Sequence, residues 1–322
     1  MTEILEEQQK MNSSIPKPGD ARRVSIIGAP CGFGASIAGV DLGPAAMRVA
    51  GLRQRVAQLG YEVRDLGDQR MDCSASTPAA GEKLRYLPEI TAACVRLAAD
   101  VKAIIEGGEF PIVLGGDHSV AIGSVAGVAS FYRQRGESIG LIWFDAHADM
   151  NTPETSPSGN IHGMPLAVLL GYGATELTEI EGFSPKLDPR FCAHIGARDV
   201  DPGERELIKK LGIRFFTMRE IDERGISACI DEAITIASKA QAGYHVTFDV
   251  DALDPGDAPG SGTVVRGGMT YREAHLAMEK IAEAGGALSL DVVEINTALD
   301  INNKTAQLGV ELILSALGKT IL

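Results

Sequence analysis

Two short acidic motifs carry side chains of the kinds that bind metal ions, spaced at alternate positions. The segment LIWFDAHADMN contains Asp145, His147 and Asp149, and the segment VTFDVDALDP contains Asp249 and Asp251. In an extended segment, side chains two residues apart point to the same side, so each motif directs its polar groups toward one point. Carboxylates and imidazoles bind divalent metals, and a two-metal site favours hydrolysis or a related displacement.

Both motifs follow apolar runs, at 141–144 and 246–248, that predict buried strands. A third apolar run, at 110–114, ends in GGDHS and places His118 just beyond it. These residues supply four aspartates and two histidines, which suffice for two divalent metals. Any one of them alone could be a turn or capping residue, but six at three strand ends favour a metal site. The oxygen-rich ligand set suits manganese better than zinc.

Strand-like and helix-like patterns alternate along the chain and predict an α/β fold. The strand-like segments are 23–28, 61–66, 110–114, 139–144, 191–196, 214–217, 244–248 and 288–295. The helix-like segments include 43–60, 87–107, 121–135, 164–171, 226–240, 271–284 and 305–317. This order predicts a mostly parallel sheet with helices on both faces, and thus three layers. Without a linker or repeat, we expect one domain over residues 22–322, after a flexible N-terminal tail at 1–21.

Composition limits the classes of function. The chain has 322 residues, is 45% hydrophobic and carries a formal net charge of -13. That charge argues against nucleic-acid binding, which needs a basic face, and would suit a cationic substrate, although many cytoplasmic proteins are acidic. Five scattered cysteines without C-x-x-C spacing predict reduced thiols. No apolar run reaches the about 18 residues of a membrane helix, and the polar N-terminus predicts no signal peptide, so we expect a cytoplasmic protein with no membrane partner.

Several motifs together resemble the ureohydrolase family, and their order and spacing resemble arginases most closely. They are GGDHS (115–119), DAHADMN (145–151), SGNIHGMP (158–165), DVDPGE (199–204), FDVDALDP (248–255), GTVVRGGMTYRE (262–273) and VVEIN (292–296). The resemblance implies a three-layer sandwich around an eight-stranded, mostly parallel sheet. It also implies two Mn²⁺ per subunit, bridged by Asp145 and Asp249. His118 and Asp149 would complete one coordination sphere, and His147 and Asp251 the other.

The activity that this resemblance implies is hydrolysis of L-arginine to L-ornithine and urea. A guanidinium carbon is a poor electrophile, and water at neutral pH is a weak nucleophile. A metal-bridging water with its pKa lowered toward roughly 7 supplies the hydroxide that attack requires. Asp149 is then placed to accept the remaining proton of the hydroxide.

Two further residues are candidates for catalysis. Glu294 follows the apolar run 288–293 and would pair with the substrate guanidinium, with a structural carboxylate as the alternative. Thr263 is expected to contact the substrate near Glu294 and to hydrogen-bond that glutamate. His162 lies in a polar loop, and its near-neutral pKa suits proton delivery to the leaving amine, with a structural loop role as the alternative.

Two loops predict which substrate is bound. By the arginase pattern, Asn151, Ser158 and Asn160 would hold the α-carboxylate of arginine. Asp201 and Glu204 would take the α-ammonium. The preference of such residue types for turns could explain their presence in one loop. Two loops that match the same end of an amino acid favour a role in substrate binding. They argue against an agmatinase or guanidinobutyrase, and the full ligand set argues against a non-catalytic binding protein on the same fold.

Some features depart from the pattern or match none of its motifs. Val264 and Arg266 stand where the family more often has a GTPVVGG-like run, which affects the outer rim of the pocket. The glycines of GFGAS (32–36) lack the full G-x-G-x-x-G pattern of a dinucleotide site.

The resemblance implies a homo-oligomer, either a trimer or a hexamer. The histidines expected to be structural are His194, His245 and His275.

Overall fold

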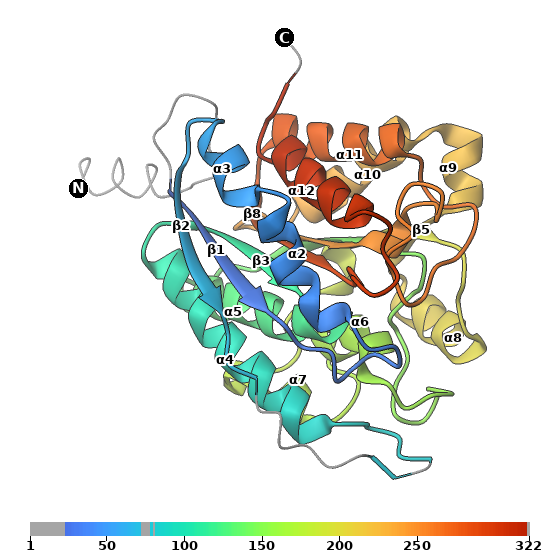
Figure 1. Cartoon of the computed structure of the whole chain (residues 1–322). Helices are drawn as coiled ribbons and strands as arrows, with labels where there is room; N and C mark the ends of the chain where they lie inside the picture. Colours follow the sequence, from blue (N-terminus) through green and yellow to red (C-terminus); the bar gives the residue numbers. More distant parts are fainter. Residues whose placement is uncertain (1–22, 72–77, 80, 321–322) are drawn as a thin grey trace.

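A single parallel sheet organises the molecule. The computed structural model describes residues 23–71, 78–79 and 81–320, so the predicted tail at 1–21 lies outside the described residues. The sheet order is β2-β1-β3-β8-β7-β4-β5-β6, and every adjacent pair is parallel (Figure 1). The eight strands are β1 (Arg23–Ala29), β2 (Glu62–Asp68), β3 (Phe110–Gly115), β4 (Gly140–Phe144), β5 (Cys192–Ala197), β6 (Arg214–Thr217), β7 (Tyr244–Asp249) and β8 (Ala287–Val293). The eight-stranded, mostly parallel sheet that the resemblance implied is confirmed, with all adjacent strands parallel.

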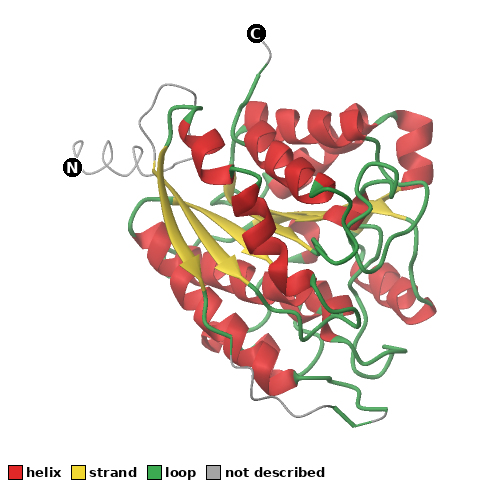
Figure 2. Cartoon of the chain, viewed as in Figure 1, coloured by secondary structure: helices red, strands yellow, loops and turns green. Residues whose placement is uncertain are grey.

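Helices cover both faces of the sheet, which gives the three predicted layers (Figure 2). One face packs against α2 (Gly43–Val49), α3 (Leu52–Ala57), α9 (Met218–Arg224), α10 (Ile226–Ala237), α11 (Tyr271–Ala284) and α12 (Lys304–Ala316). The other packs against α4 (Leu87–Glu106), α5 (Ala121–Arg133), α6 (Pro165–Leu169), α7 (Thr175–Thr178) and α8 (Pro202–Leu211).

Side chains alternate between the two cores along each strand. In β4, Ile142 and Phe144 join the core under α10 and α11, whereas Leu141 and Trp143 join the core under α4 and α5. A parallel sheet covered on both faces buries both sets, which explains why its strands read as nearly continuous apolar runs. The strand ends are thereby held rigidly, and the loops that follow them can carry chemistry.

One predicted helix is two helices in the structure. The pattern at 43–60 is divided between α2 and α3 because Gly51, between them, has a φ of 84°. That left-handed conformation is open to glycine and interrupts the helical backbone. The other predicted helices are found within a few residues of their expected bounds, whereas α7, α8 and α9 were not predicted individually.

Two expectations from composition can be compared with the structure. None of the helices in the described ranges is long and apolar enough to cross a membrane. Four of the five cysteines are buried free thiols, at positions 31, 94, 192 and 229, and Cys73 lies outside the described residues.

Candidate metal centre and substrate pocket

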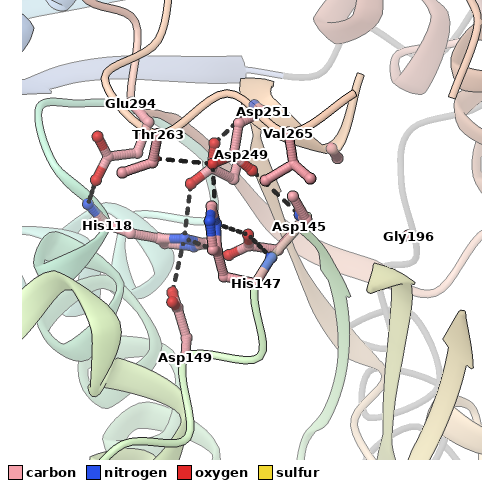
Figure 3. A network of polar contacts seen from close by, with 12 residues as sticks. His118, Asp145, His147, Asp149, Gly196, Asp249, Asp251, Thr263, Val265 and Glu294 are labelled. Carbon is pink, nitrogen blue, oxygen red and sulfur yellow. Dashed lines mark hydrogen bonds and ion pairs between the residues drawn. The ribbon is translucent and has the colours of Figure 1, made fainter. Parts of the chain in front are cut away.

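The candidate site lies at the carboxyl ends of four neighbouring strands in the middle of the sheet. Strands β3, β8, β7 and β4 are adjacent in that order, although they are far apart in the sequence. His118 follows β3, Glu294 follows β8, Asp249 ends β7 and Asp145 follows β4. The topology therefore brings these side chains to one place, as Figure 3 shows.

His118 lies at the centre of the first ligand group. Its Nδ1 atom is 3.1 Å from Oδ2 of Asp145, 3.1 Å from Oδ2 of Asp149 and 3.3 Å from Oδ2 of Asp249. All four side chains are buried. Among the described residues, neither the His118 Nδ1 atom nor the Asp149 Oδ2 atom makes a hydrogen bond. Buried polar atoms without hydrogen-bond partners cost free energy, so these two atoms are placed to contact a bound ion or ligand.

His147 forms a second ligand group beside the first. Its Nδ1 atom is 3.0 Å from Oδ2 of Asp251 and 3.4 Å from Oδ1 of Asp145. Asp145 therefore contributes one oxygen to each group, and each group has the spacing of a possible metal site. The structure thus brings together all six ligands predicted from the sequence.

Tight turns, and not extended backbone, make these ligands converge. Strand β4 ends at Phe144, and the Asp145 carboxylate accepts a hydrogen bond from the His147 N–H at 2.7 Å. The Asp249 carboxylate similarly accepts from the Asp251 N–H at 2.8 Å, within the short 3-10 helix Val250–Ala252. Asp149 has a φ of 53°. The reasoning from extended alternation was therefore wrong about the local backbone, although the residues meet as expected.

The donor set fits divalent cations. In the metal-free chain, burial and the charge of Asp145 raise the pKa of Asp149 to about 8. Burial opposes the charged form of His118, but its close contacts with the carboxylates of Asp145, Asp149 and Asp249 outweigh burial and raise its pKa well above the usual value. Oxygen-rich sites with imidazoles suit hard or borderline divalent metals, and buried charges of this density require such a counter-ion.

Glu294 and His162 form a pair beside the ligand groups. Oε1 of Glu294 accepts a hydrogen bond from the His118 N–H at 2.9 Å and lies 2.9 Å from Nδ1 of His162. Burial opposes the charge on each, but their mutual attraction prevails: it lowers the pKa of Glu294 and raises that of His162 to about 9. The expected hydrogen bond from Thr263 to Glu294 is wrong. The Thr263 hydroxyl donates instead to Oδ2 of Asp251 at 2.9 Å (Figure 3).

A cavity of about 170 Å³ opens above the ligand groups. Of the predicted site residues, Asp145 and Asp251 lie behind its wall, and the other twelve line it. These are His118, His147, Asp149, Asn151, Ser158, Asn160, His162, Asp201, Glu204, Asp249, Thr263 and Glu294. Sequence reasoning missed two polar lining residues, Ser156 and Asp199. Asp199 begins the motif DVDPGE, and Ser156 lies in the loop between the motifs DAHADMN and SGNIHGMP, so both are close to residues that the sequence had indicated.

Two loops form the outer wall of the cavity and are tied to each other. The Asn151 side-chain amide donates to Oδ2 of Asp201 at 2.9 Å. The Glu204 carboxylate accepts from the Met150 N–H at 2.9 Å and from the Asp201 N–H at 2.7 Å. Asp201 and Glu204 also form the capping box that begins α8. Burial raises the pKa of Glu204 to about 7. The helix therefore fixes the position of the acidic loop.

The third side of the rim comes from the loop 156–160. The Ser158 hydroxyl accepts a hydrogen bond from the Asn160 N–H at 3.1 Å, and the Asn160 side chain donates to the Ser36 hydroxyl at 2.6 Å. The GFGAS segment thus supports the rim of the pocket. Val264, one of the two departures from the family pattern, is 45% exposed and does not line the cavity.

Comparison with known proteins identifies the family. The sequence model of the Arginase family matches residues 22–318. The chain belongs to the arginase family. It is 48% identical over 300 residues to an arginase of Bacillus caldovelox, a match that covers 93% of this chain and 99% of that relative.

Solved structures of arginases agree with the fold. The native structure of Bacillus caldovelox arginase is 46% identical, has a TM-score of 0.89, and is matched over 94% of this chain and 100% of that one. A crystal structure of arginase from Bacillus subtilis is 47% identical with a TM-score of 0.87 over the same shares of the two chains. The predicted family, the arginase-like fold and the assignment as an arginase-type hydrolase are confirmed.

Proposed function

We propose that this chain hydrolyses L-arginine to L-ornithine and urea, with two Mn²⁺ per subunit held by its two ligand groups. The observation that carries the proposal is the pair of groups that share Asp145 beneath a cavity of about 170 Å³ with a polar rim. We further propose that residues 22–322 act as one catalytic domain and that residues 1–21 are a tail outside it.

The metal ligands follow from the two groups. His118, Asp149, Asp145 and Asp249 would hold one ion. His147, Asp251 and Asp145 would hold the other, with Asp249 shared as a second bridge. Four carboxylates balance the charge of two divalent cations. When bound, two such cations lower the pKa of water and supply a nucleophile at neutral pH.

The chain's own residues would bind the guanidinium and move the protons. Glu294, ionised by its contact with His162, would pair with the guanidinium and hold its carbon over the ligand groups. Asp149, on the cavity wall, would accept the proton that the nucleophile loses on attack. His162, protonated at neutral pH, would deliver a proton to the leaving nitrogen of ornithine.

The rim would recognise the amino-acid end of the substrate. Asn151, Ser158 and Asn160 offer amide and hydroxyl groups to the α-carboxylate. Asp201 would take the α-ammonium, supported by Glu204, whose carboxylate holds the Asp201 backbone. Thr263 would contribute from the inner wall, where its hydroxyl also fixes Asp251.

Agmatine is the main competing substrate, because it carries the same guanidinium without the carboxylate. A rim with three polar groups for a carboxylate favours arginine, since agmatine would leave them without a partner.

From the resemblance we also propose a cytoplasmic homo-oligomer, a trimer or hexamer, with no nucleic-acid or membrane partner. Light scattering on the purified chain measures its oligomeric state directly.

Labelled water tests the proposed reaction. The Mn²⁺-loaded protein is incubated with L-arginine in ¹⁸O-water, beside a sample stripped of metal by chelation. We expect ornithine and urea in equal amounts, with the label in urea, from the loaded sample only. Loaded protein that bound Mn²⁺ but gave no ornithine, or equal rates from the stripped protein, would contradict the proposal.

A further inference from the structure

A pair of ionisable residues lies inside the sheet, outside the site already described. His245 of β7 and Asp291 of β8 are both fully buried, and His245 Nε2 is 2.9 Å from Asp291 Oδ2. Nδ1 of His245 is 2.6 Å from the Ser289 hydroxyl, and Ser124 of α5 donates to the same Asp291 oxygen at 2.6 Å. A buried ion pair often stabilises a fold no better than apolar side chains would, so its presence points to another role.

The pair belongs to a polar ladder that leads to the metal centre. Strands β7 and β8 are adjacent, and their register places His245 opposite Ser289 and Thr247 opposite Asp291. The Thr247 Oγ1 atom is 3.0 Å from Nε2 of His118. One hydroxyl thus lies between the buried carboxylate and the ring of a proposed metal ligand.

Asp291 is ionised, and this fixes the direction of the hydrogen bonds. Burial raises its pKa, but the electrostatic attraction of His245 and the hydrogen bonds with His245 and Ser124 outweigh burial and lower it. A carboxylate only accepts hydrogen bonds, so a hydroxyl that bonds to Asp291 must point its proton at the carboxylate. Oδ1 of Asp291 accepts no hydrogen bond from any described residue, and the register places Thr247 opposite it, so this oxygen is open to the proton of the Thr247 hydroxyl.

When its proton points to Asp291, the Thr247 hydroxyl can only accept a hydrogen bond from His118. When the His118 ring is neutral, as a metal ligand must be, it then carries its proton on Nε2, which leaves a lone pair on Nδ1. Nδ1 is the atom that faces Asp145, Asp149 and Asp249 and makes no hydrogen bond. We propose that Asp291, held by His245 and Ser124, is a positioning residue that sets the tautomer of His118 for metal binding.

This inference rests on the proposed function, because it assigns His118 to one of two Mn²⁺ sites. Partners behind a metal-binding histidine fix its ring and tautomer, and their loss costs about 10- to 100-fold in metal affinity. The effect is specific to one site, since His147 in the second ligand group is not connected to this ladder by any hydrogen bond among the described residues.

The test is Mn²⁺ titration of Asp291→Asn by calorimetry, with bound metal counted by elemental analysis. The amide of asparagine can donate to Thr247, which would turn the hydroxyl toward His118 and put the proton on Nδ1. We expect wild-type protein to bind two Mn²⁺. The variant should bind one with wild-type affinity and the other about 10- to 100-fold more weakly.

The matched control is His275→Gln, in a second buried histidine–serine pair far from the site. Nδ1 of His275 is 2.8 Å from the Ser315 hydroxyl, between α11 and α12. This variant should lose stability yet keep both Mn²⁺ affinities. A folded Asp291→Asn that binds two Mn²⁺ as wild type does, or loses both equally, would overturn the inference.

Thr247 provides a second test if Asp291→Asn does not fold. Thr247→Ser keeps the hydroxyl and should keep both affinities, whereas Thr247→Val removes it and should weaken one site. Equal affinities in the two variants would overturn the inference. Wild-type protein that bound no Mn²⁺ would instead contradict the proposed function, and this inference with it, so the two failures are distinguishable.

Discussion

The Nδ1 atom of His162 lies 2.9 Å from Oε1 of Glu294, and this contact sets the charge of both side chains. Without it, burial would favour the neutral form of each residue. With it, Glu294 has a lowered pKa, and the pKa of His162 is raised to about 9. The site therefore holds a negative charge for a guanidinium and a proton for a leaving amine at neutral pH.

Replacing His162 should slow the reaction without removing metal. In His162→Asn we expect kcat for arginine to fall about 100-fold, the scale of a general acid. Mn²⁺ content should remain that of wild type, because His162 contacts Glu294 and no member of the two ligand groups in the described structure. Steady-state kinetics and elemental analysis on the same preparation test this. Loss of metal with activity would show that the residue has a structural role.

The contribution of His162 to kcat should depend on pH. Its pKa is raised, so the ring is protonated below about 9 and loses its proton above that value. The ratio of wild-type kcat to that of His162→Asn should therefore be largest near neutral pH and decline as pH rises through about 9. A ratio that stayed constant from neutral to strongly alkaline pH would remove the proton-delivery role.

Removing the shared carboxylate should abolish metal binding and activity together. Asp145 contributes an oxygen to each ligand group, so Asp145→Ala disrupts both. We expect less than one Mn²⁺ per chain and no measurable urea. Asp222→Ala, at an exposed position on α9, is the matched control and should bind metal normally. Normal metal content in Asp145→Ala would contradict the bridging role.

Metal removal should destabilise the folded chain. A ligand that binds only the folded state at 100 times its Kd adds about 2.7 kcal/mol to the free energy of unfolding. Chelation should therefore lower Tm by several degrees, and added Mn²⁺ should restore it. Thermal unfolding with and without chelator measures the change. An unchanged Tm would mean that the buried carboxylates hold no metal in the folded protein.

The rim should discriminate arginine from agmatine. Ser158→Ala and Asp201→Asn each remove a polar contact to the amino-acid end, and asparagine keeps the N-cap of α8. A lost hydrogen bond to a charged group costs about 1.5–3 kcal/mol, so KM for arginine should rise about tenfold or more. KM for agmatine should change little for Ser158→Ala. Equal changes in KM for both substrates in Ser158→Ala would refute the assignment of the carboxylate-binding loop.

The sequence predicted the site well because strand ends and ligand types are local features. Apolar runs located the strands, and the alternation of strands with helices implied a parallel sheet whose carboxyl ends meet. The positions of His118, Asp145 and Asp249 followed from that alone. The order of strands in the sheet, which makes β3, β8, β7 and β4 neighbours, depends on long-range packing and came only from the structure.

What sequence reasoning missed depends on backbone detail and on contacts between distant segments. Asp149 and Glu294 adopt left-handed backbone conformations that no residue pattern indicated. Thr263 turned out to contact Asp251, which lies twelve residues away, and not Glu294. His245 was expected to be structural because it matches no motif of the family. Its contact with Asp291 joins two strands that only the register brings together.

The central claim is that the two ligand groups hydrolyse a guanidinium whose other end is an amino acid. The most direct test is urea release from Mn²⁺-loaded protein, with L-arginine and agmatine compared at equal concentrations. We predict rapid release from arginine and a much smaller kcat/KM for agmatine. Preference for agmatine would keep the metal chemistry and contradict the assignment of the 151–160 and 199–204 loops. Urea from neither substrate would contradict the account as a whole.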